Sequence, residues 1–220
     1  MNQPETNGRI VVFARAPRHG EVKTRLARTA GAAAALAHYR TMLRDTLGVV
    51  REAMLQLPGL DVELCVAGQD PDGECARLAA LHGAALAAQV GDSFGERLGA
   101  ALDRALLDGR MPVLVGSDAV SLTAGDLKDA LAALRDHDAT FAPTEDGGFA
   151  LVGLRRPVEG LFDDLPWGTD TLMAVTRRRL DELGVDWVQL RTLWDVDDEP
   201  GLRRWLARTV PAHGAAAPAA

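Results

Sequence analysis

Short apolar segments alternate with stretches of helical periodicity over the first 140 residues, and this alternation limits the fold more than any other feature of the chain. Residues 9–16, 61–67 and 111–116 are rich in β-branched residues and predict buried strands. Helical patterns over residues 30–57 and 93–107 separate them. Strands joined through helices predict an α/β protein whose mostly parallel mixed sheet is flanked by helices on both faces.

The remaining segments continue the same pattern. Further strands are expected at 84–89, 139–142, 149–154 and 185–190, and further helices at 72–82, 123–135, 169–183 and 199–208. The helix over 30–57 has Gly48 as a point where it could break. We expect a single nucleotide-binding domain over residues 9–208, a disordered N-terminus over 1–8, and a disordered tail rich in alanine, proline and glycine over 209–220.

Composition narrows the classes of partner. The 24 basic and 31 acidic residues give a formal net charge of −7, which argues against a nucleic-acid surface. The excess carboxylates could be metal ligands, or could simply keep the protein soluble. Cys65 and Cys75 form no CxxC pair and no zinc spacing, which fits a reducing compartment. Because the chain also lacks a long apolar run and an apolar signal core, we expect a cytoplasmic protein that does not contact membranes.

The first buried strand opens into a basic loop. Four cations, Arg15, Arg18, Lys23 and Arg25, fall within eleven residues at this strand end. Backbone amides together with several cations ahead of a helix form an anion cradle, although a solvated basic loop would have the same composition. The loop matches neither GxxxxGK[ST] nor GxGxxG.

Carboxylates follow two other apolar segments. Asp118 comes directly after the strand over 111–116, and Asp195 and Asp197 share one face if Val196 is buried between them. Oxygen ligands of this kind suit Mg²⁺. The alternative is capping: Asp118 or Ser121 would cap the helix over 123–135, and the acids at 195–198 the last helix.

Three further segments could contact a substrate. Asp146 could bond a hydroxyl while Gly147 and Gly148 let the backbone approach a ligand, although Asp-Gly is also typical of an ordinary hairpin. Trp167 could form a pocket wall, or act as a hydrophobic staple with Thr169 as the cap. Residues 91–98 could contact a base or ribose, or cap a helix. The five scattered histidines form no HExxH, and Ser117 lies outside a GxSxG motif, so zinc and serine-hydrolase chemistry are not indicated.

These motifs occur in a specific order: FARAPRHGEVKTRL, GDSFGERL, GSDAVSL, PTEDGGFALVGL, PWGTD and DVDD. The ordered set resembles the bacterial DUF2064 family of glycosyltransferase-A-like (GT-A) proteins, in the nucleotide-diphospho-sugar transferase superfamily, over residues 9–205. The basic loop also resembles that of phospholactate guanylyltransferase and, more distantly, those of molybdenum-cofactor guanylyltransferases. The resemblance implies a Rossmann-like GT-A fold.

The resemblance also implies roles for individual residues. The implied catalytic residues are Lys23, Arg25 and Asp118, and the implied metal ligands are Asp118, Asp195 and Asp197. Nucleotide binding is implied for Arg15, Pro17, Gly20, Lys23, Thr24, Arg25, Gly91, Asp92, Arg97 and Ser117. Acceptor binding is implied for Asp146, Gly147, Gly148, Trp167 and Thr169.

This sequence departs from the family pattern at two places. Ala119-Val120 replaces the usual proline-containing pair after Gly-Ser-Asp, which we expect to loosen the turn beside Asp118. Gly168 stands where serine is common.

Three functions follow as hypotheses. The first is a metal-dependent nucleotidyltransferase that uses Mg²⁺ or Mn²⁺ to move NMP from an NTP to a small phosphorylated acceptor, with release of pyrophosphate. The second is a glycosyltransferase with a nucleotide-diphospho-sugar donor. It is weakened because only Ser-Asp, and no clear DxD, follows the central strand. The third is a non-catalytic nucleotide-binding protein. The helices exposed on such a fold would permit a homodimer.

Overall fold

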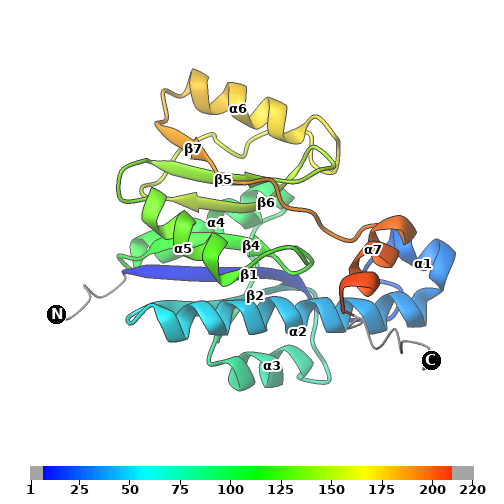
Figure 1. The fold of residues 1–220 in the computed structure, drawn as a ribbon. Coiled ribbons are helices and arrows are strands. Elements are labelled where there is room, and N and C mark those ends of the chain that lie inside the picture. Colours follow the sequence, from blue (N-terminus) through cyan, green and yellow to red (C-terminus); the bar gives the residue numbers. More distant parts are fainter. Residues whose placement is uncertain (1–6, 210–220) are drawn as a thin grey trace, which may run out of the picture.

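The computed structural model describes residues 7–209 and shows a seven-stranded sheet between two layers of helices (Figure 1). The strands are β1 (Gly8–Arg15), β2 (Asp61–Ala67), β3 (Ala85–Ala88), β4 (Met111–Gly116), β5 (Ala139–Pro143), β6 (Phe149–Leu154) and β7 (Trp187–Gln189). The helices are α1 (Thr24–Ala30), α2 (Ala32–Gln56), α3 (Glu74–His82), α4 (Phe94–Leu107), α5 (Ala124–Ala133), α6 (Leu172–Glu182) and α7 (Glu199–Thr209).

The sheet has the order β3-β2-β1-β4-β6-β5-β7, with β1 near its centre. Strand β1 pairs in parallel with β2 and β4, and β2 with β3. Strand β6 is antiparallel to both β4 and β5, so the sheet is mixed. The carboxyl ends of β1 and β4 therefore lie side by side, and ligands of α/β sheets bind beyond such ends.

Both faces of the central strands are buried, which explains their continuous apolar runs. In β1, Ile10 and Val12 point into a core shared with α2, α3 and α5. Their neighbours Val11 and Phe13 point into the opposite core, which α4 and α6 complete. The predicted mostly parallel mixed sheet with helices on both faces is confirmed.

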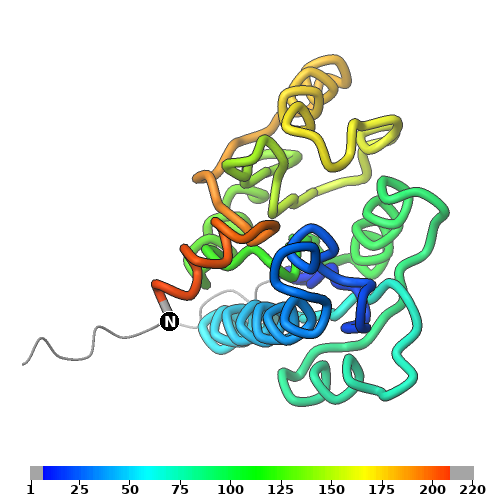
Figure 2. The backbone as a smooth tube through the Cα atoms, turned by 90° about the vertical axis from the view of Figure 1, so that its right-hand side faces the viewer, coloured from blue at the N-terminus to red at the C-terminus, as the bar shows by residue number. Residues whose placement is uncertain are grey.

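A third, smaller core lies at the carboxyl end of the sheet. It joins Leu26 of α1 to Met42 of α2 and Trp205 of α7. Figures 1 and 2 both show the C-terminal helix α7 beside α1 at this end of the molecule. Helix α7 is thereby held against α1, the helix that follows the basic loop.

Several predicted boundaries differ from the structure. The helix predicted over 30–57 is confirmed as α2, which runs through Gly48 without a break. Helix α1, which Gly31 at φ 84° separates from α2, was not predicted. Gly8, assigned from the sequence to a disordered N-terminus, is the buried first residue of β1. Thr209, assigned from the sequence to the disordered tail, is the last residue of α7. The structure also describes Asn7, whereas residues 1–6 and 210–220 of the predicted disordered ends fall outside the described residues. None of the helices between residues 7 and 209 has the length and apolar character needed to cross a bilayer.

Candidate functional site

A cavity of about 740 Å³ opens at the carboxyl ends of the central strands. Its size is that of a small-molecule site. Of the residues predicted from the sequence, thirteen line it: Arg15, Lys23, Thr24, Arg25, Arg97, Ser117, Asp118, Asp146, Gly148, Trp167, Thr169, Asp195 and Asp197. The ends of the central strands, the basic loop and residues 195–198, here called the late acidic segment, therefore meet in one place.

Lys23 holds two of the acids together. Its Nζ donates to Asp118 Oδ2 at 2.5 Å and to Asp197 Oδ1 at 2.8 Å, and its side chain is only 6% exposed. Burial opposes the charge of the ammonium, but the attraction of the two carboxylates outweighs it and raises the pKa of Lys23. Its backbone adopts the left-handed conformation, φ 48°, which is uncommon for a residue with a side chain. Arg25 is exposed and lies 3.5 Å from Asp197 Oδ2.

Asp118, Asp195 and Asp197 form an acidic triad in which one ligand atom from each lies within 4.8 Å of the others. Burial, and then the charges of Asp118 and Asp197, raise the pKa of Asp195 to about 7. Carboxylates crowded in this way repel one another unless a cation lies between them. Oxygen donors at this spacing fit a hard divalent cation such as Mg²⁺ or Mn²⁺.

The capping alternative is wrong for Asp118. Thr123 and Asp126 form a complete capping box at the start of α5, so this helix needs no other cap. Ser121 instead uses its hydroxyl to accept from the backbone N–H of Trp194 and to donate to the carbonyl of the same residue. This contact fixes the late acidic segment against the turn after β4.

The acids of the late acidic segment make different contacts. Val196 is fully buried, and Asp195 and Asp197 both reach the triad, as the sequence predicted. The segment is not a strand, however, because only Leu193 pairs with the sheet, through an isolated bridge. Asp198 accepts from the backbone N–H of Gly201 at 2.9 Å and so helps to cap α7.

The pair Ala119-Val120 stabilises the turn beside Asp118 by a backbone hydrogen bond and by packing. The backbone N–H of Val120 donates to the carbonyl of Asp118 at 2.8 Å, a bond that a proline at this position could not make. Ala119 is buried in the main core, and Val120 packs against the small core under α7. The turn that we expected to be loosened is therefore hydrogen-bonded and packed.

Tyr39, from the first half of α2, contacts the ends of both central strands. Its buried hydroxyl accepts from the backbone N–H of Arg15 and donates to the carbonyl of that residue, both at 2.9 Å. It also lies 3.2 Å from Ser117 Oγ. Burial raises the pKa of Tyr39 to about 12, so the phenol keeps its proton. Sequence analysis missed this residue, because a tyrosine within helical periodicity is typical of an ordinary core position.

The turn after β5 is a hairpin that also lines the cavity. Thr144 donates to Asp146 Oδ1, and the backbone N–H of Gly148 donates to the same oxygen at 3.1 Å. Gly147 has φ 90°, and a Cβ on it would lie 2.0 Å from the carbonyl oxygen of Asp170. The absence of a side chain at Gly147 thus lets the hairpin approach the backbone at Asp170 closely. Gly147 itself does not line the cavity.

Aromatic rings form a row along one side of the cavity. Phe94 makes an edge contact with Phe13 at 5.7 Å between centroids and a tilted contact with Trp167 at 4.7 Å. Trp167 lies 5.9 Å from Phe149. The wall predicted for Trp167 is present, but Thr169 is not the cap of α6, which begins at Leu172. The Thr169 hydroxyl instead donates to the carbonyl of Pro166 at 2.7 Å.

Some predicted residues lie away from the cavity. Pro17, Gly20, Gly91 and Asp92 do not line it, as is also true of Gly147. Arg18, one of the four cations of the loop, pairs with Glu21 instead. The segment 91–98 does cap α4, through the capping box of Ser93 and Glu96.

Other residues line the cavity although the sequence did not single them out. Besides Tyr39 they include Phe13, Phe94, Phe149 and Gln89, whose amide donates to the carbonyls of Ala14 and Cys65. Phe94 and Phe149 stand inside motifs that were recognised, so their position in those motifs was the only signal. Arg97 also lines the cavity, and its Nε is buried without a partner among the described residues.

Several solved structures have a fold similar to that of this chain. A crystal structure from Desulfovibrio desulfuricans G20, described as a candidate nucleotide-diphospho-sugar transferase, has 30% identity and a TM-score of 0.76. The match covers 88% of this chain and 83% of that one. CMP-2-keto-3-deoxy-manno-octonic acid synthetase complexed with CTP has 15% identity and a TM-score of 0.54, covering 92% and 100%.

A third structure is glucosyl-3-phosphoglycerate synthase of Mycobacterium tuberculosis, in complex with Mn²⁺, UDP and glucosyl-3-phosphoglycerate. It has 13% identity and a TM-score of 0.50, covering 91% of this chain and 76% of that one. These likenesses confirm the Rossmann-like GT-A fold that the resemblance implied. No curated protein matches the chain.

A family model matches more than half of the sequence. It spans residues 49–169 and is described as "Uncharacterized protein conserved in bacteria (DUF2064)". The matched region holds the strand that precedes Asp118, the hairpin with Asp146, and Trp167. The chain therefore belongs to the DUF2064 family.

Proposed function

We propose that this protein is a metal-dependent nucleotidyltransferase that moves NMP from an NTP to a small phosphorylated acceptor. The observation that carries the proposal is the meeting of Lys23, Arg25 and the acidic triad in the lining of one cavity. Arg15 and Arg97 also line this cavity, so four cations surround it. A triphosphate needs more positive charge than a diphosphate does, which favours an NTP.

In the proposed reaction an oxygen of the acceptor forms a bond to the α-phosphorus of the NTP. The bond between that phosphorus and the oxygen bridging to the β-phosphate breaks, and pyrophosphate leaves with the electron pair. A divalent cation held by Asp118, Asp195 and Asp197 would neutralise charge on the phosphate oxygens. Lys23 and Arg25 would stabilise the departing pyrophosphate, and no side-chain nucleophile is required because positioning and charge provide the catalysis.

The residues that line the cavity suit two substrates. The cations come from the end of β1, the basic loop and α4, and we assign Asp146, Gly148, Trp167 and Thr169 to the acceptor. Aromatic surface next to a carboxylate can contact an apolar face of the acceptor while accepting from a hydroxyl.

Glycosyl transfer from a nucleotide-diphospho-sugar is the second candidate. It is favoured by the description of the Desulfovibrio structure and by the Mn²⁺ and UDP in the mycobacterial one. The same metal site would then stabilise a departing nucleoside diphosphate.

One assay separates the candidates. The protein is incubated with Mg²⁺ or Mn²⁺, each of the four ribonucleoside triphosphates, and a panel of phosphorylated acceptors, and pyrophosphate is measured. Release that depends on both metal and acceptor supports the proposal. Consumption of a nucleotide sugar with appearance of nucleoside diphosphate contradicts it and supports the second candidate. Metal-dependent binding of NTP without turnover on any acceptor would indicate a non-catalytic nucleotide-binding protein.

A further inference from the structure

The ammonium of Lys23 lies where a divalent cation needs its ligands. Its Nζ is 2.5 Å from an oxygen of Asp118 and 2.8 Å from an oxygen of Asp197, and both acids belong to the triad. Lys23 makes each contact at hydrogen-bond distance, so the two carboxylates are already neutralised in part.

A metal ion in the triad and the Lys23 ammonium would compete for the same carboxylates. A divalent cation bound by the same two carboxylates would lie within a few ångströms of Nζ, and the two positive charges would repel each other. The Lys23 side chain is only 6% exposed, so solvent screens this repulsion weakly. The ammonium also occupies one oxygen of each carboxylate that the metal would use.

We propose that Lys23 is an exchangeable counter-ion: it neutralises Asp118 and Asp197 in the metal-free protein, and a divalent cation displaces it from them. A lysine can make this exchange because four rotatable methylenes carry its charge. Arg25 is a poor substitute, since it is 63% exposed and lies 3.5 Å from the other oxygen of Asp197.

One part of the inference rests on the proposed function, namely the new position of the Lys23 ammonium after its displacement. A phosphate chain in the cavity gives the displaced ammonium a new partner, as the P-loop lysine illustrates for phosphates in general. Metal and nucleotide then promote the binding of each other, because each favours the same position of Lys23. Without nucleotide, metal binding is weakened by the competing ammonium.

The first test measures Mn²⁺ binding to the full chain without nucleotide, from the free-ion signal in electron paramagnetic resonance. We expect Lys23→Met to bind Mn²⁺ at least tenfold more tightly than the wild type. The matched control is Arg25→Met, which removes one positive charge near the same triad and should change the affinity by less than threefold. Equal affinity of Lys23→Met and wild type, or an equal gain in both variants, would overturn the exchange.

The second test uses the wild type, so it does not depend on the folding of a variant. The protein is labelled with ¹⁵N at lysine, and the protected ammonium resonance of Lys23 is distinguished from that of the only other lysine in the sequence, Lys128, whose side chain is exposed. Titration with Mg²⁺ should remove this resonance or shift it to the position of an exposed lysine. Saturation with Mg²⁺ that leaves the resonance unchanged would show that metal and ammonium bind side by side, contrary to the proposal.

Neither test contains a substrate. A failed pyrophosphate assay therefore leaves the exchange open to support from these titrations. Conversely, a failed exchange leaves nucleotidyl transfer standing, with Lys23 fixed on its carboxylates.

Discussion

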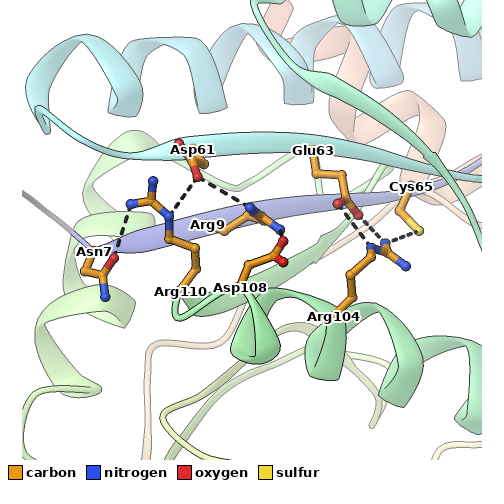
Figure 3. Close-up of polar contacts among 8 residues, drawn as sticks. All are labelled: Asn7, Arg9, Asp61, Glu63, Cys65, Arg104, Asp108 and Arg110. Carbon is orange, nitrogen blue, oxygen red and sulfur yellow. Dashed lines mark hydrogen bonds and ion pairs between the residues drawn. The ribbon is translucent and has the colours of Figure 1, made fainter.

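The amino and carboxyl ends of the central strands, here called the amino edge and the carboxyl edge, use charged side chains in opposite ways. At the amino ends of β1 and β2, Arg9 lies between Asp61 and Asp108, and Arg110 also pairs with Asp61 (Figure 3). At the carboxyl ends, three carboxylates crowd around one buried ammonium. Charges that are matched in pairs support the fold, whereas carboxylates crowded closely enough to raise the pKa of one of them, Asp195, are typical of a functional site.

The same contrast holds one step further along β2. Glu63 is 6% exposed and accepts two hydrogen bonds from Arg104 of α4, beside Cys65 (Figure 3). This pair ties β2 to the helix that carries part of the cavity, without reaching the cavity itself. We therefore expect mutations at the carboxyl edge to change activity, and mutations at the amino edge to change stability.

The largest effect is expected for Asp118→Asn. The variant should fold, because Lys23 keeps Asp197 as a partner, but its turnover should fall about a thousandfold since a metal ligand and its charge are lost. Pyrophosphate release at saturating metal and NTP measures the loss, and circular dichroism checks the fold. Turnover within tenfold of the wild type would remove Asp118 from the catalytic site.

Glu63→Ala should have the next largest effect, on stability alone. Removing the carboxylate leaves the Arg104 guanidinium, which is 32% exposed, without its partner, and we expect a loss of about 2–3 kcal/mol in the free energy of unfolding. Urea denaturation measures it. Mn²⁺ affinity serves as the control and should not change, and a large change in that affinity would show that the two edges are coupled.

Asp195→Asn should stabilise the metal-free protein at high pH. The pKa of this carboxyl is about 7 in the folded protein against an ordinary value of 3.8, so the folded state binds its proton more tightly. Its contribution to stability is therefore greatest near pH 4 and is lost as the pH rises to about 7. Asparagine does not ionise, so the variant should gain about 1–2 kcal/mol over the wild type at pH 8, after allowance for solvent screening.

Unfolding in urea with EDTA, at pH 4.5 and pH 8, tests this difference. The gain should appear at pH 8 and be much smaller at pH 4.5. An equal gain at both values would mean that the carboxyl is unfavourable for a reason other than its charge. Saturating Mg²⁺ should reverse the order at pH 8, because the wild type then has the better metal site.

Sequence alone predicted what local signals encode. The end of β4 at Gly116 follows from an apolar run, and the Thr123 cap follows from its spacing to Asp126. The separate helix α1 was missed because nothing in the composition around Gly31 distinguishes a left-handed residue between two helices from a helix start.

The contacts that form the site could not be predicted from the sequence, for a different reason. Lys23 meets acids 95 and 174 residues further along the chain, and Tyr39 reaches Arg15 from within a helix. Such pairings depend on how the sheet and helices pack, which no local spacing records. The motif resemblance supplied the acids and the lysine as candidates, and the packing of the elements supplied their partners.

The smallest effect is expected for Asp108→Asn at the amino edge. Asp108 accepts from Arg9 at 2.6 Å, but its side chain is 53% exposed and Arg9 keeps Asp61 nearby at 3.5 Å. An exposed ion pair contributes little because water and salt screen it, so the free energy of unfolding should fall by less than about 1 kcal/mol. The loss should shrink further in 1 M NaCl. A loss as large as that of Glu63→Ala would mean that the whole amino-edge network acts as one unit, and stability would then depend on that network as a whole rather than on its single buried pair.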